Sequence, residues 1–155
     1  MPDKDKDGER DKAVNRRAFH DYFIDEKYEC GLVLTGTEVK SIREGRCNLR
    51  DGYVRIDSDE AWLENVHISP YAQGNVMNQE PVRPRKLLLH KRQINSLIGK
   101  LRQKGYTMVP LRLYVTRNHV KVEIGLARGK REYDKREAIA EQEAKREIAR
   151  AVRRG

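Results

Sequence analysis

Two alternating segments in the second half of the chain limit its fold more than any other feature. Apolar residues occupy every second position of residues 111–115 and again of residues 120–126. A repeat of two is typical of strands that bury one face, because successive side chains point to opposite sides of a sheet. The intervening Arg117-Asn118-His119 supplies a turn. The sequence therefore predicts an antiparallel hairpin, and the fold must provide a sheet for it to join.

Four further segments combine aromatic and β-branched residues and are predicted strands. They are His20–Leu34, with a bulge around Asp25–Lys27, Tyr53–Ile56, Ala61–Ile68 and Lys86–Leu89. The last of these segments could instead lead straight into a helix. The polar residues 57–60 are predicted to form a turn, and residues 70–84 a loop, because Pro, Asn, Gln and Gly are frequent there.

Two short helices interrupt these strands. Thr35 and Glu38 have the spacing of a capping box, which predicts a helix over residues 37–44. Between residues 90 and 104, apolar residues recur at the three- and four-residue spacing of a helix. Hairpins with two inserted helices, and no regular alternation of strand and helix, favour a mainly β fold, either a barrel or a sandwich. An OB-like (oligonucleotide-binding) antiparallel β-barrel fits the size and the charge.

The positive charge of the chain is concentrated in one block. The formal net charge is +9, with 33 Lys and Arg against 24 Asp and Glu. The 42 residues from 81 to 122 contain 11 basic residues and no acidic one. Such clustering favours a polyanion such as nucleic acid over a basic face that serves only solubility. No apolar run approaches the roughly 20 residues of a membrane span. A membrane surface is also less favoured as a partner, because no Lys- and Arg-rich amphipathic helix exposes Trp, Phe and Leu together.

The two ends of the chain differ in composition from its middle. Residues 1–12 alternate Asp and Lys without a hydrophobic stretch, so we expect no secretory signal peptide and assign residues 1–14 to a disordered leader. The barrel is predicted to span residues 15–127, the size of one domain. Residues 128–155 are predicted to be a basic tail that is disordered alone and helical when bound, since they are charged and lack a core face.

No combination of residues in the sequence is typical of a catalytic site. There is no phosphate-binding glycine loop, zinc-protease motif or nucleophile elbow. The four histidines are scattered, and Cys30 and Cys47 have no metal-binding spacing, so both are predicted to be reduced and half-buried. Asp57, Asp59 and Glu60 could hold Mg²⁺, but a solvated turn is the preferred interpretation. We therefore expect a binding protein without cofactor or metal, and not an enzyme.

Five separated motifs occur in the order found in one known family. They read Asn15-Arg16-Arg17-Ala18, His20-Asp21-Tyr22, Gly36-Thr37-Glu38-Val39-Lys40-Ser41, Arg85-Lys86-Leu87-Leu88-Leu89, and Gly129-Lys130-Arg131 followed by Asp134-Lys135-Arg136. On these residues the chain resembles the SsrA-binding protein (small protein B, SmpB) family over residues 13–155. The resemblance implies an OB-like barrel that binds the tRNA-like domain of transfer-messenger RNA (tmRNA). With that RNA, the family acts in trans-translation and rescues stalled bacterial ribosomes.

The resemblance also implies which residues bind RNA. The residues that match family contacts to the tRNA-like domain are Asn15, Glu29 and Leu88, and the nearby Arg16, Arg17, His20 and Lys86 extend that surface. Basic groups would hold phosphates, Asn15 and Glu29 would read base edges or 2′-hydroxyls, and Leu88 would contact an unstacked base. Without the resemblance, Glu29 would be interpreted as a solvent-facing carboxylate and Leu88 as a core residue.

In the tail, the resemblance implies a segment that occupies the decoding centre and the empty mRNA channel of the ribosome. Its residues are Gly129, Lys130, Arg131, Tyr133, Asp134, Lys135 and Arg136. Tyr133 stands where some relatives have His, although its ring still permits stacking on a base. Ala144 stands where some relatives have Trp, so anchoring of the tail helix is expected to be weaker or differently placed.

The implied partners are tmRNA and the ribosome, including small-subunit ribosomal RNA, for a cytoplasmic protein expected to be a monomer. Two other functions remain as alternatives at this stage. One is a basic ribosomal or ribosome-assembly protein, and the other is an RNA-processing enzyme. A small stable RNA that co-purifies with the protein would favour tmRNA binding, whereas metal-dependent RNA cleavage would favour the enzyme.

Overall fold

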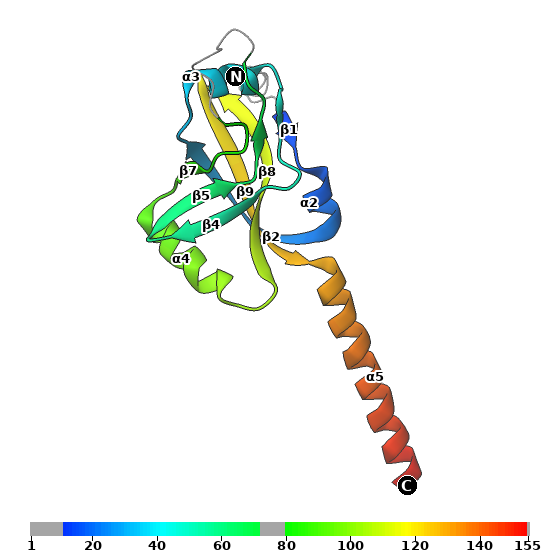
Figure 1. Ribbon diagram of the computed structural model, residues 1–155. Helices are drawn as coiled ribbons and strands as arrows, with labels where there is room; N and C mark the ends of the chain where they lie inside the picture. Colours follow the sequence, from blue (N-terminus) through cyan, green and yellow to red (C-terminus); the bar gives the residue numbers. More distant parts are fainter. Residues whose placement is uncertain (1–10, 72–79, 155) are drawn as a thin grey trace, which may run out of the picture.

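The computed structural model describes residues 11–71 and 80–154, without the side chains of residues 131–139 and 153–154 (Figure 1). Residues 1–10 of the predicted leader therefore lie outside the described residues. The elements in chain order are β1 (Asp11–Val14), α2 (Arg16–Asp21), β2 (Tyr22–Leu32), α3 (Gly36–Arg43), β3 (Cys47–Asn48), β4 (Tyr53–Asp57), β5 (Glu60–Glu64), β6 (His67–Ile68), β7 (Arg85–Leu88), α4 (Lys91–Leu101), β8 (Tyr106–Thr116), β9 (His119–Gly129) and α5 (Lys130–Arg154).

Seven strands form one antiparallel sheet in the order β1-β8-β9-β2-β7-β5-β4, and β3 pairs with β6 in a second, two-stranded sheet. The large sheet curls until β4 lies beside β8. Gly52 permits this approach, since a Cβ atom there would lie 2.6 Å from Val66 and 2.8 Å from the Pro110 ring. Within residues 11–71 and 80–154 no ladder joins β4 to β8, so the barrel is open along this seam. The predicted mainly β, antiparallel fold is confirmed, as a loose barrel.

The predicted hairpin forms the long strands β8 and β9, and its inner face supplies much of the core. A register shift between Pro110 and Arg112 inserts a bulge into β8. The bulge turns Leu111 to the outer face, where it packs against Ala18 of α2 in a second, smaller apolar cluster. The alternation predicts Leu111 on the same face as Leu113, and this assignment is wrong because the inserted residue shifts the register.

Both predicted helices are confirmed. At the start of α3, the Thr35 hydroxyl accepts a hydrogen bond from the Glu38 amide at 3.3 Å, and the Glu38 carboxylate accepts one from the Thr35 amide at 3.0 Å. Gly45, at φ +74°, lets the chain turn after the helix. Helix α4 buries Ile94 and Leu97. The capping box therefore fixes the start of α3, and its Glu38 has a second role described below.

The N-terminal end of the described chain departs from the prediction. Residues 11–14, assigned to the disordered leader, form strand β1 along β8. The Asp11 carboxylate lies 2.9 Å from the Arg112 guanidinium, and Ala13 packs against the core. The partner strand β8 lies about 100 residues away in sequence, so local composition does not reveal β1.

Helix α2 is also absent from the prediction, which started a strand at His20. Asn15 caps α2, and the strand β2 begins at Tyr22. The bulge expected in this strand is confirmed, because the register with β9 shifts between Ile24 and Glu26. A short helix with one buried residue leaves little periodic signal in a sequence.

The segment predicted as one strand over residues 61–68 is divided into β5 and β6. Asn65 separates them at φ +60°, a backbone conformation that strands do not adopt. The predicted strand Lys86–Leu89 is confirmed as β7. Of the predicted loop 70–84, residues 72–79 lie outside the described residues.

A buried ion pair joins α3 to β7. The Arg85 guanidinium is fully buried and lies 2.7 Å from the Glu38 carboxylate, which also accepts a hydrogen bond from Arg83. Arg85 further donates to the carbonyl groups of Val66 and Pro81, so one side chain holds the segments before and after the loop. Arg85 is the only basic side chain that is fully buried among the described residues.

The carboxyl group of Glu38 is ionised in this setting. Burial alone raises its pKa, but hydrogen bonds from Arg83, the Thr35 amide and Arg85 outweigh burial and hold the pKa below its usual range. A carboxyl pKa that is lower in the folded than in the unfolded chain stabilises the fold above the unfolded pKa. This contribution is lost as the pH falls through the folded-state pKa of Glu38.

Helix α5 leaves the barrel at the end of β9 and projects away from it (Figure 1). The helical part of the tail prediction is confirmed, and the helix begins at Lys130. Strand β9 runs to Gly129, two residues past the expected end of the barrel. The expectation that the tail is disordered in isolation stays a prediction.

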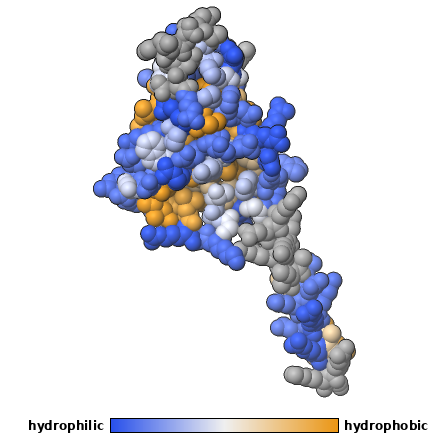
Figure 2. Space-filling model, in the orientation of Figure 1, coloured by the Kyte–Doolittle hydropathy of each residue, from blue (hydrophilic) through white to orange (hydrophobic). Residues whose placement is uncertain are grey.

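Most of the visible surface is hydrophilic, including the described part of α5 (Figure 2). Orange, apolar areas are visible on the barrel, one of them low on the molecule near α4 (Figure 2). Between β4 and α4, Ile56, Ile98 and Leu101 line a hollow of about 340 Å³. None of the helices within the described ranges is both long and apolar enough to cross a membrane.

We predict that Arg85→Met lowers the free energy of unfolding by about 3–5 kcal/mol, because it removes the fully buried partner of the Glu38 carboxylate and leaves only the partly exposed Arg83 and the Thr35 amide. Lys86→Met is the matched control on the opposite face of β7. Its ammonium lies 3.6 Å from Glu60 in solvent, so its loss should cost less than about 1 kcal/mol. Urea unfolding followed by the fluorescence of Trp62, the single tryptophan, measures both. Equal losses of unfolding free energy in the two variants would contradict the conclusion that the buried Arg85–Glu38 pair stabilises the fold.

Candidate nucleic-acid interface

The predicted RNA-binding residues lie in two separate places. Glu29, Lys86 and Leu88 lie on the outer face of β2 and β7, whereas Arg17 and His20 lie on α2, beside the start of α5. Tyr22, where β2 leaves α2, is seven residues from Glu29 in the same strand, which spans roughly 23 Å. The structure thus places these residues on two surfaces, toward the two ends of β2. That one RNA domain contacts both surfaces stays a prediction.

The β2–β7 surface contains an exposed apolar platform. Leu88 is 54% exposed and lies opposite Gly31 in the ladder between the two strands. Because Gly31 has no side chain, Leu88 lies across its backbone, with Cδ1 3.2 Å from where a Cβ atom would be. Val33, which is 49% exposed, continues the platform. The interpretation of Leu88 as a core residue is therefore wrong, and its side chain is open to a ligand.

Basic side chains border this platform. Lys86 lies opposite Trp62 of β5, and Lys121 of β9 lies opposite Gly31 on the other side of β2. Sequence analysis did not single out Lys121 or Trp62 as site residues. The alternation of inward and outward side chains in β5 and β9 could have indicated them, because it places both residues on the outer face once the strand register is known. An apolar platform between two ammonium groups is suited to an unstacked base with its flanking phosphates.

Glu29 is held in place by a buried tyrosine. The Tyr114 hydroxyl donates a hydrogen bond to Oε2 of Glu29, and Tyr114 is 1% exposed. Burial, together with this carboxylate, raises the pKa of Tyr114 well above its usual value, so the hydroxyl remains a donor at physiological pH. Within the described chain, no hydrogen bond reaches Oε1 of Glu29. That oxygen is available to accept from an external group.

A second carboxylate lies directly opposite Glu29. Glu123 of β9 faces Glu29 in the ladder, and two like charges in that position repel each other. The Arg112 guanidinium compensates, since it lies 3.4 Å from Glu123 and 4.4 Å from the centre of the Tyr114 ring. Asp11 of β1 contacts the same guanidinium. Strand β1 thus helps to position Arg112, which packs on Tyr114, the residue that holds Glu29.

Asn15 is a structural residue in this arrangement. Its side chain is 4% exposed, and its amide group donates to the carbonyl groups of Pro110 at 2.9 Å and Leu49 at 3.3 Å. Its carbonyl oxygen accepts from the Ala18 amide at 3.1 Å and caps α2. The side chain is therefore not available to read a base, in contrast to its predicted role. It sets the position of α2.

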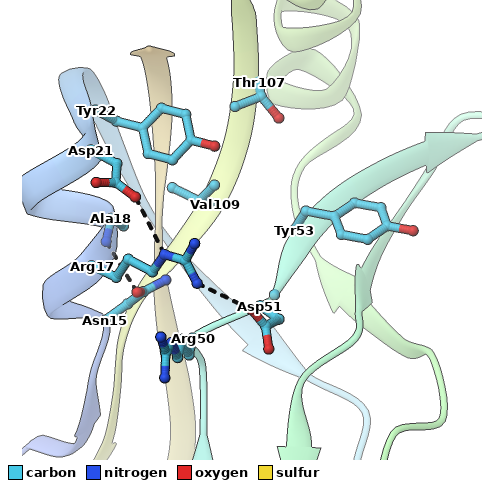
Figure 3. A pocket seen from close by; sticks show the side chains of 11 residues that line it. Asn15, Arg17, Ala18, Asp21, Tyr22, Arg50, Asp51, Tyr53, Thr107 and Val109 are labelled. Carbon is cyan, nitrogen blue, oxygen red and sulfur yellow. Dashed lines mark hydrogen bonds and ion pairs between the residues drawn. The ribbon is translucent and has the colours of Figure 1, made fainter. Parts of the chain in front are cut away.

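The second surface is a cleft between α2 and the start of α5. Its volume is about 930 Å³, and its walls include Arg17, His20, Arg50 and Lys130. Figure 3 shows the adjoining hollow of about 290 Å³, where Arg17 points toward Asp21 and Asp51, at distances of 3.3 Å and 3.7 Å. Arg50, which sequence analysis missed, forms no ion pair with any residue that the structure describes.

His20 and Asp21 form an exposed pair in this cleft. The His20 side chain is 88% exposed, and its Nδ1 lies 2.9 Å from the Asp21 carboxylate. The hydrogen bond with His20, assisted by Arg17, lowers the pKa of Asp21. Arg16, also predicted, is exposed at the start of α2.

The predicted tail residues divide at the boundary of the described side chains. Gly129 ends β9 opposite Tyr22, and Lys130 begins α5. For Arg131, Tyr133, Asp134, Lys135 and Arg136 the backbone is helical, and their side chains lie outside the described residues. Their predicted roles are therefore neither confirmed nor contradicted by the structure.

The basic block of residues 81–122 does not form one positive surface. Five of its 11 basic residues pair with acids from elsewhere in the chain. These are Arg83, Arg85, Lys86, Lys100 and Arg112. The other six have no ion pair within the described ranges, and they are Lys91, Arg92, Arg102, Lys104, Arg117 and Lys121. The remaining positive charge lies on α4, in the turn between β8 and β9, and beside the Leu88 platform.

No group of three or more His, Cys, Asp or Glu side chains within the described residues is placed to hold a metal ion. Burial raises the pKa of the Cys30 thiol to about 12 and that of Cys47 to about 11. Both thiols are therefore protonated at neutral pH.

The comparison with known proteins agrees with these observations. The family model for SmpB protein matches residues 12–154. The chain belongs to the SmpB family. It is 62% identical to the SsrA-binding protein of Carboxydothermus hydrogenoformans over 141 residues, which cover 91% of this chain and 95% of that protein. It is also 62% identical to the SsrA-binding protein of Roseiflexus castenholzii over 146 residues, covering 94% and 92%.

A solved structure extends the match to three dimensions. Its description reads "tmRNA-SmpB: a journey to the center of the bacterial ribosome", and one of its chains superposes with a TM-score of 0.66 at 48% identity. The match covers 79% of this chain and 85% of that one. The fold and the family are therefore shared, and the resemblance identified in the sequence is confirmed.

We predict that Asn15→Ala destabilises α2 rather than removing a ligand contact. The substitution removes the side-chain hydrogen bonds to the Ala18 amide and to the Pro110 and Leu49 carbonyl groups, and should cost about 2 kcal/mol. Arg16→Ala, at an exposed neighbouring position, is the control and should cost less than about 0.5 kcal/mol. Hydrogen exchange of the α2 amides reports the effect. Unchanged protection in Asn15→Ala would show that the side chain is not a structural cap.

Proposed function

We propose that the protein binds the tRNA-like domain of tmRNA and acts with it in trans-translation, rescuing stalled bacterial ribosomes. The observation that carries the proposal is the match of the SmpB family model over residues 12–154. The relatives named SsrA-binding protein and the tmRNA-SmpB structure on the ribosome support it. The function is RNA binding without catalysis, performed by a monomer in the cytoplasm and without a cofactor.

The β2–β7 surface is the proposed site for the tRNA-like domain. Leu88, lying across Gly31, offers an apolar platform for an unstacked base. Lys86 and Lys121 neutralise the adjacent phosphates. The free oxygen of Glu29 accepts a hydrogen bond from a base edge or a 2′-hydroxyl. Such a bond requires a donor at one place in the RNA and therefore gives a selectivity that phosphate contacts alone do not.

Helix α5 is the proposed ribosome-binding part. Its 25 residues form a rod of about 37 Å that carries little apolar surface of its own. Such a rod fits a channel lined by ribosomal RNA phosphates, where it occupies the decoding centre and the empty mRNA path. The residues proposed to make these contacts are Gly129, Lys130, Arg131, Tyr133, Asp134, Lys135 and Arg136. Tyr133 supplies an aromatic ring for stacking on a base.

We predict that Glu29→Gln lowers affinity for the tRNA-like RNA by about tenfold or more, since it weakens a charged hydrogen bond, and leaves binding to random RNA unchanged. Lys86→Gln should weaken the binding of both RNAs and lower the slope of log binding constant against log salt concentration by about 1. Glu44→Gln, at the exposed end of α3, is the neutral control. Filter binding at several salt concentrations measures all three. Equal losses on both RNAs for Glu29→Gln would remove its role in selectivity.

Tyr114→Phe separates the position of Glu29 from its charge. The variant retains the carboxylate and loses only the hydroxyl that holds it. We expect an intermediate loss of selective binding, about fivefold, with random RNA unaffected. A loss of binding to random RNA as well would indicate that Tyr114→Phe disrupts the fold, since Tyr114 is buried.

We predict that a chain ending at Gly129 binds the tRNA-like RNA within about twofold of the full chain and fails to support tagging on stalled ribosomes. The end point is chosen because β9, and the ion pair of Arg128 with Asp25 at 2.9 Å, are then complete. A translation assay on messages without a stop codon measures tagging. Loss of RNA binding, or retention of full tagging, contradicts the division between barrel and tail.

A further inference from the structure

Among the side chains that the structure describes at the start of α5, Lys130 contacts the barrel. The Lys130 ammonium donates a hydrogen bond to the Phe19 carbonyl oxygen at 3.2 Å and lies 5.5 Å from the centre of the Phe23 ring. We infer that Lys130 is a positioning residue: it fixes the first turn of α5 to α2 and so sets the direction in which the tail leaves the barrel. The positioning role is argued from the structure alone, and only its effect on ribosome rescue rests on the proposed function.

The Phe19 carbonyl is a suitable anchor for a cation. It lies in the last turn of α2, where carbonyl groups lack partners within the helix and carry partial negative charge. A lysine at this position satisfies the carbonyl and opposes the helix dipole. Lys130 belongs to another element, so the interaction joins the end of one helix to the start of the next.

The Phe23 ring completes the attachment from the side of the sheet. The Arg128 guanidinium of β9 lies 5.5 Å from the centre of the same ring, so Phe23 has a cation on each side of the strand-to-helix boundary. Arg128 is itself held by Asp25 through two hydrogen bonds of 2.9 and 3.1 Å. Phe19 and Phe23 are the only two phenylalanines of the chain, and both lie at this junction.

The attachment relates the cleft to the tail. Helix α2 contributes Arg17 and His20 to the cleft, and Lys130 lines the same cleft from the opposite side. Because Lys130 ties α2 to α5, RNA contacts made by α2 and contacts made by the tail have a fixed geometric relation. Gly129, which precedes Lys130, has no atom within 4 Å of its missing Cβ position, so packing around Gly129 does not provide this restraint.

Distance measurements between two nitroxide labels on the full chain test the inference. One label replaces Asn95 on exposed α4, and the other replaces Ala140 on exposed α5. The native Cys30 and Cys47 thiols are buried or half-buried and have raised pKa values, so labelling favours the introduced cysteines. We expect the distance distribution to broaden at least about twofold in Lys130→Met. Lys130→Arg, which retains both contacts, and Arg150→Met, which removes a charge elsewhere in α5, should leave it unchanged.

Phe23→Leu provides an independent variant, because it removes the ring and retains the charge of Lys130. It should broaden the distribution and lower tagging about fivefold, while binding of the tRNA-like RNA stays within about twofold. Equal widths in the parent and Lys130→Met chains overturn the inference, and so does a parent distribution that is already as broad as that of a disordered tail. The distances are measured on the free protein, so this result does not depend on the proposed function. A failure of that function would appear instead as full tagging by the chain that ends at Gly129.

Discussion

The length of strand β2 is the constraint on which the arrangement of both surfaces depends. Its 11 residues pair with β9 along almost the whole strand and with β7 at one end only. The end paired with β7 carries Gly31 and presents the Leu88 platform. The other end continues from α2 and meets the start of α5. A strand held by two ladders cannot shorten, so the two surfaces stay roughly 23 Å apart.

Electrostatics reinforces this separation. From the sequence alone, the acid-free block of residues 81–122 suggests a single positive surface. In the fold, Glu38 and other acids from outside the block form ion pairs with almost half of its basic residues. One of these basic residues, Arg85, is buried in the interior. Positive charge without a partner is left beside Leu88 and on α4. The cleft at the start of α5 has its own cations, Arg17 and Arg50, from outside the block.

Sequence patterns predicted the parts of the fold that depend on near neighbours. The β8–β9 hairpin, the capping box of Thr35 and Glu38, and the bulge in β2 are all local patterns, and the structure contains each of them. The parts that sequence missed depend on distant partners. Strand β1 requires β8, and the inward position of Arg85 requires Glu38. Leu88 is exposed because its neighbour across the ladder is a glycine, which no reading of β7 alone reveals.

The most direct test of the two-surface account is hydroxyl-radical cleavage of RNA from iron chelates tethered to either surface on the ribosome. The chelate replaces Glu60 beside the Leu88 platform in one variant and Asp51 beside the cleft in the other, so neither variant loses a cation. The account predicts that the probe at position 60 cleaves the part of the tRNA-like domain that covers the Leu88 platform, and that the probe at position 51 cleaves a different RNA segment, next to α2 and the start of α5. Cleavage of the same RNA segment from both positions would contradict it.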